Sequence, residues 1–205
     1  MITIHLLAPN DQFKWHSVWK HCYNIWESSP YEIKMWSDEE VDKLLKEDDE
    51  EFFNILNTLP PIYKFDYVRY IILEKFGGAY FDMDVEIING SFLNTLNPIK
   101  MYFMEGTLGS YIENSIMIAT KIPQYNQDLF YRIKTYIKRK VIDNIEDCST
   151  FNVLKYVGAY ALSDWFSRYI HQTNQQYEIL GQYQFASTTN EIVYTRHHQT
   201  SEWNK

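Results

Sequence analysis

Two aspartates one residue apart, Asp82 and Asp84, directly follow the short apolar segment Ala79-Tyr80-Phe81. Such a segment is typical of a buried strand, and open α/β sheets bind ligands at the carboxyl ends of their strands. Two carboxylates placed there can share one Mg²⁺ or Mn²⁺ through oxygen ligands. The same pair also fits a solvated turn, so the surrounding elements must decide between the two interpretations.

Asp66 and Arg69 lie upstream of this pair and are three residues apart. A helix is predicted to begin at Pro60-Pro61, because proline is tolerated in a first turn, and to end near Phe76 at Gly77-Gly78. Asp66 and Arg69 then point to one side of that helix. They form either a surface ion pair or a second charged group beside the aspartate pair.

The remaining elements alternate between strands and helices. Periodicity and turn residues predict strands at Ile2–Leu7, Tyr31–Trp36, Met101–Met104, Ser115–Ala119 and between Tyr177 and Tyr194, and helices at Trp15–Trp26, from a capping box at Ser37–Glu40, from Pro123, and at Thr150–Ile170. The acidic run Glu47–Glu51 is predicted to be a solvent-exposed helix face. This alternation indicates an α/β fold with a central, mostly parallel sheet flanked by helices. A length of 205 residues is typical of one domain, which we expect to cover residues 1–205. The alternative is that this domain is a piece of a longer multidomain protein.

The composition argues against several classes of protein. Nineteen Lys and Arg against 27 Asp and Glu give a net charge of −8, so we expect no nucleic-acid partner. No stretch approaches the roughly 18 apolar residues of a membrane span, and the N-terminus lacks the basic region of a signal peptide. We therefore expect a cytoplasmic protein whose Cys22 and Cys148 are free thiols, although one disulfide is the alternative. Aromatic residues make up 17% of the chain. They would either pack in the core or line a sugar-binding cleft.

Two segments resemble the signature of the DXD sugar-transferase family. They are Lys64–Tyr70 and Phe76–Val85, and the family includes the yeast initiating mannosyltransferases, the α-1,4-galactosyltransferases and the clostridial glucosylating toxins. Weaker matches follow in the family's order: Ile4-His5, Asn114-Ser115, Gly158-Ala159, and His197-His198 with Ser201-Glu202-Trp203. The chain is also similar to glycan-building proteins of large algal viruses, which would place it in the host cytoplasm.

The resemblance implies a GT-A-type nucleotide-sugar-binding fold and a metal-dependent hexosyltransferase. Its donor would be a nucleotide diphosphate sugar, with UDP-sugars favoured over GDP-sugars, and its acceptor would be a hydroxyl group of a glycan. The transfer would retain the configuration at the anomeric carbon. Two aspartates would repel the diphosphate unless Mn²⁺ or Mg²⁺ lay between them. That cation would also act as a Lewis acid on the departing diphosphate.

The resemblance also implies roles for individual residues. Asp84 and either His197 or His198 would bind the metal, and Asp82 would contact both metal and ribose. Arg69 would neutralise the diphosphate or donor sugar, and Asp66 would accept hydrogen bonds from sugar hydroxyls. Asn114 would be the third catalytic residue beside these two. Ser201 and Trp203 would close over the phosphates. Neighbours in an extended segment face opposite ways, so at most one histidine reaches the metal. The family pattern favours His197, and a solvated histidine pair is the alternative.

One departure from the family concerns the nucleotide base. Relatives place a tryptophan after the opening Ile-His, where this chain has Ala8. Base recognition would then use the backbone near Leu7 and Ala8, or another aromatic such as Trp36. His5 itself is expected to be a structural residue of a buried strand.

Two other functions compete with a transferase. A haloacid-dehalogenase-like phosphohydrolase also uses Asp-x-Asp, but expects Thr or Val at the position that Glu86 occupies. A sugar- or nucleotide-binding module that has lost catalysis is the other alternative, and the intact Asp82, Asp84 and Arg69 argue against it.

Overall fold

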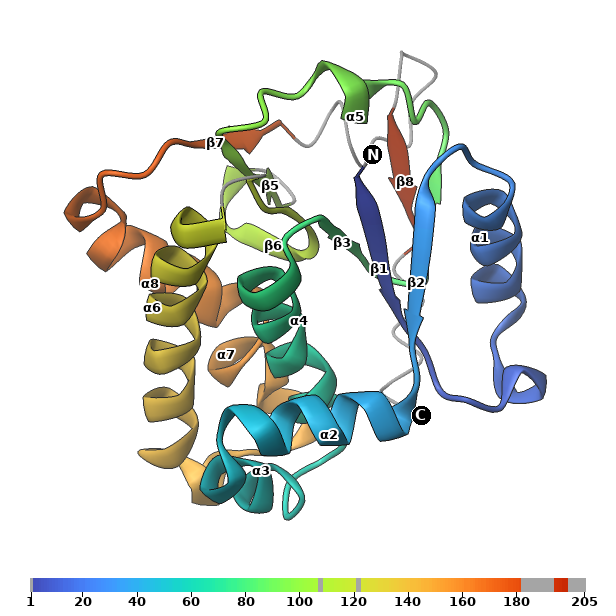
Figure 1. Cartoon of the computed structure of the whole chain (residues 1–205). Coiled ribbons are helices and arrows are strands. Elements are labelled where there is room, and N and C mark those ends of the chain that lie inside the picture. Colours follow the sequence, from blue (N-terminus) through green and yellow to red (C-terminus); the bar gives the residue numbers. More distant parts are fainter. Residues whose placement is uncertain (1, 107–108, 121–122, 182–193, 199–205) are drawn as a thin grey trace.

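The computed structural model describes residues 2–106, 109–120, 123–181 and 194–198 (Figure 1). Within these residues a six-stranded sheet has the order β2-β1-β3-β6-β5-β7, and β4 and β8 form a separate two-stranded sheet. The strands are β1 Thr3–Leu7, β2 Glu32–Trp36, β3 Ala79–Phe81, β4 Val85–Ile87, β5 Met101–Glu105, β6 Ile112–Ile118, β7 Tyr177–Leu180 and β8 Thr195–His197. Only β6 runs against its neighbours in the larger sheet, which confirms the predicted mostly parallel α/β architecture.

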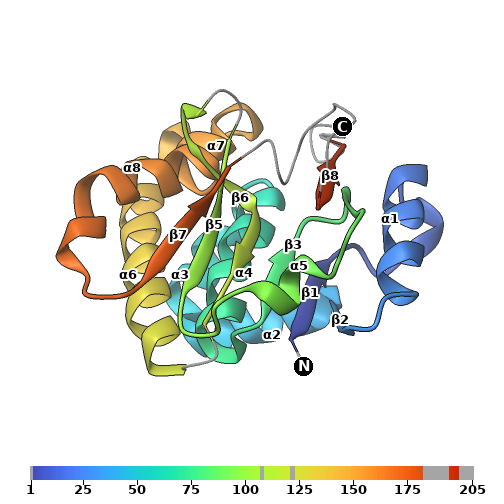
Figure 2. The ribbon, with the colours of Figure 1, turned by 90° about the horizontal axis from the view of Figure 1, so that it is seen from above.

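Helices cover both faces of the larger sheet (Figures 1 and 2). The α-helices are α1 Ser17–Glu27, α2 Asp38–Asp48, α3 Glu50–Leu56, α4 Ile62–Phe76, α5 Phe92–Thr95, α6 Pro123–Ile142, α7 Val153–Tyr156 and α8 Ala159–Tyr169, with 3₁₀ turns η1 Gln12–Lys14, η3 Ile145–Asp147, η4 Thr150–Asn152 and η5 Ile170–Gln172. Strand alternation divides the core: Tyr80 packs with α2–α4 and α6–α8, whereas Ala79 and Phe81 pack with α1, β4 and α5.

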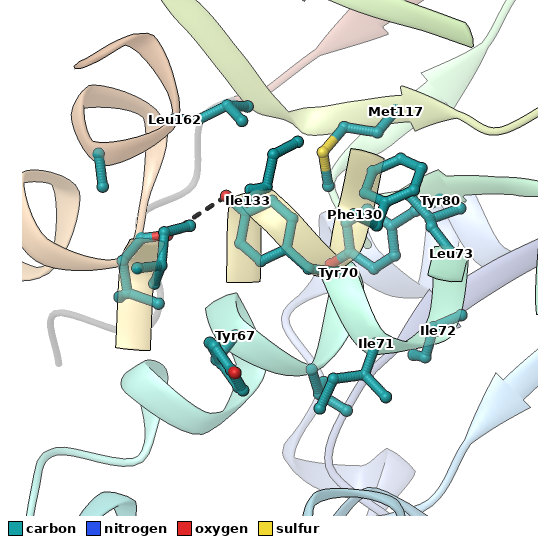
Figure 3. Close-up of a cluster of buried hydrophobic side chains, with 14 of the residues drawn as sticks. Tyr67, Tyr70, Ile71, Ile72, Leu73, Tyr80, Met117, Phe130, Ile133 and Leu162 are labelled. Atoms are coloured by element: carbon teal, nitrogen blue, oxygen red, sulfur yellow. Dashed lines mark hydrogen bonds between the residues drawn. The ribbon is translucent and has the colours of Figure 1, made fainter. Parts of the chain in front are cut away.

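Helix α4 is the centre of the larger core. Its buried positions surround the helix rather than form one stripe, because α2, α3 and α6 pack around it. Figure 3 shows Tyr67, Tyr70 and Ile71 of α4 within this cluster. The helix begins after Pro60-Pro61 and ends at Gly77, as predicted.

The two glycines after α4 allow β3 to lie beside β1. Gly77 and Gly78 have φ angles of 66° and 77°, which strongly favour glycine. A Cβ on Gly78 would lie 2.5 Å from the carbonyl oxygen of Thr3. Both the positive φ and this close approach therefore require glycine at the α4–β3 turn.

His5 is a structural residue, as expected. The indole of Trp36 donates to its Nδ1 at 3.2 Å, and its Nε2 donates to the carbonyl of Gly77 at 3.0 Å. Burial lowers the pKa of His5 from 6.5 to about 4, so the imidazole is neutral at pH 7. Cys22 and Cys148 are free thiols, and no disulfide joins them.

Two predictions about helices are wrong. The helix expected at Thr150–Ile170 is interrupted at Val157-Gly158, where Gly158 caps α8 and lies so close to Asp66 that a Cβ would come within 3.0 Å of Oδ2. The run Glu47–Glu51 is not a uniformly solvated face. Asp49 ends α2 and caps α3, Asp48 binds Lys134 at 2.5 Å, and Asp49 pairs with Lys138.

No strand was predicted after Tyr194, where an extended polar segment was expected, but Thr195–His197 form β8. Its partner β4 was not predicted either. Strands of three residues carry too little periodicity to be identified from the sequence. No helix within the described ranges combines the length and the apolar character that crossing a membrane requires.

Candidate active site

The aspartate pair lies at the carboxyl end of β3, as predicted. The backbone N–H of Asp82 donates to the carbonyl of Ser115 at 2.9 Å, which continues the ladder with β6. The chain then turns, with the N–H of Val85 donating to the carbonyl of Asp82 at 3.0 Å. Tyr80 donates from its hydroxyl to Oδ1 of Asp82 at 2.6 Å. The turn and the tyrosine thus hold both carboxylates at one corner of the sheet.

Asp66 and Arg69 form a buried pair beneath this corner rather than a surface ion pair. They are only 6% and 4% exposed. The guanidinium of Arg69 pairs with Asp66, lies 3.1 Å from Oδ1 of Asp82, and donates to the carbonyl of Asn114 at 2.8 Å. It also stacks over Tyr80, 4.7 Å from the ring centroid. Arg69 therefore links α4, β3 and β6 at the site.

An irregularity in the β5–β6 pairing places Asn114 at the site. Phe103 pairs with Met117 and the next residue, Met104, pairs with Glu113, so Asn114–Ile116 are extra residues on β6. Bulges of this kind re-aim side chains. The Nδ2 of Asn114 lies 3.4 Å from Oδ2 of Asp66. The hydroxyl of Ser115 is buried without a hydrogen-bond partner among the described residues.

His197 joins the aspartate pair through β8, which pairs Val85 with His197. Its Nε2 lies 3.2 Å from Oδ1 of Asp84. One ligand atom from each of Asp82, Asp84 and His197 lies within 4.8 Å of the others. Two carboxylates and an imidazole are a donor set that fits a divalent metal ion.

His198 has a different partner. Its Nε2 lies 3.0 Å from Oε2 of Glu86, and its backbone N–H donates to the carbonyl of Asp84 at 3.0 Å. Arg196 and His21 also contact Glu86, at 3.3 and 3.6 Å. Of the two candidate histidines, the structure brings His197 to Asp84 and places His198 beside Glu86.

The pKa values reflect crowded negative charge. Burial, and then repulsion from Asp84, raise the pKa of Asp82 to about 6 even though Arg69 attracts its charge. Burial likewise raises the pKa of Asp66, against the charge of Arg69. Burial opposes the charged form of His197, but the hydrogen bond and charge of Asp84 outweigh it and raise the pKa. A divalent cation would relieve the repulsion between the two aspartates.

A cleft of about 540 Å³ opens over this corner. Predicted residues that line it are Leu7, Ala8, Asp66, Arg69, Asp82, Asp84, Asn114 and His197. Trp36 is not among the lining residues, because it is buried against His5 and Phe76 and its indole N–H is bound to His5. It therefore presents no stacking surface to this cleft. Ser201 and Trp203 lie outside the described residues.

The cleft residues that the sequence analysis did not name as site candidates include Trp19, Tyr111, Glu113 and Tyr160. Trp19 follows the helical spacing of α1 and therefore looks like a core residue. Tyr111, Glu113 and Ser115 are spaced two residues apart, so they share one face of an extended segment. This spacing, next to the motif Asn114-Ser115, was the signal in the sequence that could have identified Tyr111 and Glu113. Nothing in the local sequence distinguishes Tyr160.

The arrangement of strands and helices is of a known fold type. A mostly parallel sheet flanked by helices, with paired aspartates at a strand end, is a GT-A-type glycosyltransferase fold. The solved structure of the PaToxG glycosyltransferase resembles this chain with a TM-score of 0.53 and 16% sequence identity, and the match covers 82% of this chain and 69% of that one. At this identity the likeness shows the shared fold.

Residues 12–102 match the family described as the glycosyltransferase sugar-binding region containing DXD motif. Inositol phosphoceramide mannosyltransferase 3 of Schizosaccharomyces pombe is 33% identical over 107 residues, which is 51% of this chain and 28% of that protein. Residues 12–102 are therefore similar to the DXD glycosyltransferase family, and the chain spans less than a third of the length of this relative. The matched segment contains Asp66, Arg69, Asp82 and Asp84, whereas Asn114 and His197 lie beyond it.

Proposed function

We propose that this protein is a metal-dependent hexosyltransferase. It transfers a hexose from a nucleotide diphosphate sugar, UDP-sugar in preference to GDP-sugar, to a hydroxyl of a glycan, with retention of configuration. The observation that carries the proposal is the convergence of Asp82, Asp84 and His197 beside Arg69 in one cleft. The family match supports it, and the base preference and the retention rest on the resemblance alone.

Asp82, Asp84 and His197 would hold Mn²⁺ or Mg²⁺, with Mn²⁺ the better fit to a site that includes an imidazole. When bound, that ion supplies Lewis-acid stabilisation of the departing diphosphate. The chain's own residues position the donor. Arg69 is one of them: the contacts with Phe65, Asn114, Asp82 and Asp66 use four of its five N–H donors. The remaining donor can reach a sugar or phosphate oxygen, and Asp66 can accept from a sugar hydroxyl.

The nucleotide would lie at the end of the cleft that β1 and α1 form. Leu7 and Ala8 end β1 there, and Trp19 of α1 lines the same cleft. In open α/β sheets the strand ends bind nucleotides. Ser201 and Trp203 keep their predicted role over the phosphates as part of this proposal.

We also propose that the enzyme works in the cytoplasm. The thiol of Cys22 is buried and that of Cys148 is half-buried, and both are free. Unpaired cysteines suit a reducing compartment.

The test is release of nucleoside diphosphate from UDP-sugars and GDP-sugars with Mn²⁺, Mg²⁺ or EDTA. We expect activity with the metals and none with EDTA, and Asp84→Ala should lower the rate at least about 100-fold, as loss of transition-state charge stabilisation does. Asp143→Ala, at an exposed site on the segment after α6, is the matched control and should keep full activity. Activity that survives both EDTA and Asp84→Ala would refute the metal mechanism. Phosphate release from simple monoesters without any use of nucleotide sugars would point to a phosphohydrolase instead.

A further inference from the structure

The cleft has a second wall for which the donor site gives no role. Tyr111 directly precedes β6, Glu113 lies on β6, and Tyr160 lies in the first turn of α8, and all three line the cleft. The nucleotide end, with Leu7, Ala8 and Trp19, is built by β1 and α1 instead. This second wall is thus built by elements of the other half of the molecule (Figure 1).

The two tyrosines of this wall are held in a defined arrangement. Their rings meet edge to face, with centroids 5.4 Å apart and planes at 90°. Tyr111 packs on the turn at Gly106, where a Cβ would lie 2.4 Å from its ring, and its carbonyl accepts from the N–H of Gly106 at 2.7 Å. Tyr160 is 51% exposed. The pair therefore presents aromatic surface to the cleft at little cost in conformational entropy.

Glu113 places a carboxylate beside these rings. The hydroxyl of Tyr111 donates to its Oε1 at 3.0 Å, which orients the carboxylate. Its charge is near enough to His197 to contribute to that residue's raised pKa. The carboxylate therefore lines the cleft beside Tyr111 and within electrostatic range of His197.

Charge and shape select the occupant of this wall. A carboxylate repels phosphate, so the diphosphate of the donor does not fit here. A neutral pyranose fits, because its C–H face stacks on an aromatic ring and its hydroxyls donate to carboxylates. Aromatic surface next to a single oriented acceptor is the usual make-up of a small-molecule site.

We propose that Tyr111, Glu113 and Tyr160 form the acceptor subsite, which binds a neutral pyranose of the acceptor glycan. The sugar stacks on the tyrosines, and its attacking hydroxyl donates a hydrogen bond to Glu113. This inference rests on the proposed function, since a donor must occupy the other end of the cleft for the subsite to serve transfer.

The experiment uses methyl pyranosides of glucose, galactose and mannose as acceptor probes. Binding is measured by saturation-transfer NMR, and transfer is compared with donor hydrolysis in the presence of metal. Tyr160→Ala should raise the KM for the glycoside about tenfold, as loss of an aromatic anchor does. Glu113→Gln should lower the ratio of transfer to hydrolysis about tenfold, because a hydrogen bond to a charged group is lost. Tyr131→Ala and Glu146→Gln, at exposed sites that do not line the cleft, are the matched controls.

The outcomes separate this inference from the proposed function. If the wild-type protein hydrolyses no nucleotide sugar, the proposed function is refuted. A pyranose subsite is still supported if a glycoside gives saturation-transfer signals with the wild type that disappear in Tyr160→Ala. If no glycoside binds the wild type, or if transfer and hydrolysis fall by the same factor in both variants, the acceptor subsite is refuted.

Discussion

Arg69 shows how single residues set the chemistry of the site. A buried guanidinium must be paired, and here Asp66 and Asp82 supply the charge while a backbone carbonyl accepts a further hydrogen bond. Asp82 also faces Asp84, and its pKa of about 6 reflects burial and that repulsion. One positive side chain therefore does not balance the three carboxylates, and a cation at Asp82, Asp84 and His197 would complete the balance.

His5 leads to a prediction about pH and stability. Its pKa falls from 6.5 to about 4 on folding, which corresponds to about 3 kcal/mol of stability. Because the folded pKa is the lower one, this contribution is complete above pH 6.5 and is lost as the pH falls toward 4. The free energy of unfolding, from urea titrations at pH 7.5 and 4.5, should show this loss in the wild type and much less of it in His5→Gln.

The matched control is His171→Gln, at an exposed site after α8. It should lose stability between the two pH values as the wild type does. Equal pH dependence in His5→Gln and the wild type would contradict the structural role of a neutral His5.

At the scale of elements, β8 decides whether the metal-binding corner is complete. Its three residues pair with β4, and they carry His197 to Asp84. Three residues form too short a ladder to be held by backbone hydrogen bonds alone. The contacts of Glu86 with Arg196, His198 and His21 therefore attach β8 to β4 and α1.

We predict that Glu86→Gln weakens metal binding through the loss of this attachment. Residues that orient metal ligands typically contribute 10- to 100-fold to affinity, so the Kd for Mn²⁺ should rise about tenfold. Calorimetric titration measures this Kd, and hydrogen exchange at residues 195–198 should become faster. The matched control is Glu178→Gln on β7, which removes a cross-strand pair with Lys100 far from the cleft and should change neither quantity. An unchanged Kd with faster exchange would show that β8 does not position the ligand.

At the scale of the whole molecule, the sheet joins two cores, and the larger one surrounds α4 (Figure 3). Lys134 of α6 ties its outer helices together, because it binds Asp48 of α2 and Glu74 of α4, each at 2.5 Å. Its side chain is only 9% exposed. The position of α4, and with it Asp66 and Arg69, depends on this packing.

Lys134→Met should destabilise the protein by about 3 kcal/mol, because two carboxylates lose their buried partner. Burial already raises the pKa of Glu74, so the deficit should be larger at pH 8 than at pH 5, where the Glu74 carboxylate can more easily take up a proton. Urea unfolding measures both values. Lys46→Met, which removes an exposed pair with Glu50, should cost less than about 0.5 kcal/mol, and a similar cost at both lysines would contradict this account.

Much of the fold was predictable because its signals are local. The capping box at Ser37 and Glu40, the prolines before α4 and the glycines after it each act within a few residues. The interruption at Val157-Gly158 was missed, and the close packing of Gly158 against Asp66 involves a helix distant in the sequence, which local spacing does not reveal. Trp36 was a reasonable aromatic for the base, but His5 and Phe76 bury it.

The sequence by itself determined that Asp82 and Asp84 end a buried strand, that Asp66 and Arg69 share one side of a helix, and that one of two adjacent histidines could join them. Local spacing decides the first two of these features, and the resemblance to the family's closing motif implies the third. Only the tertiary structure decided that His197 is the histidine that lies beside Asp84, that Asn114 reaches Asp66, and that Tyr111 and Tyr160 line the same cleft. These depend on strand pairing over more than 100 residues, as between Val85 and His197, and on register, which no local pattern encodes.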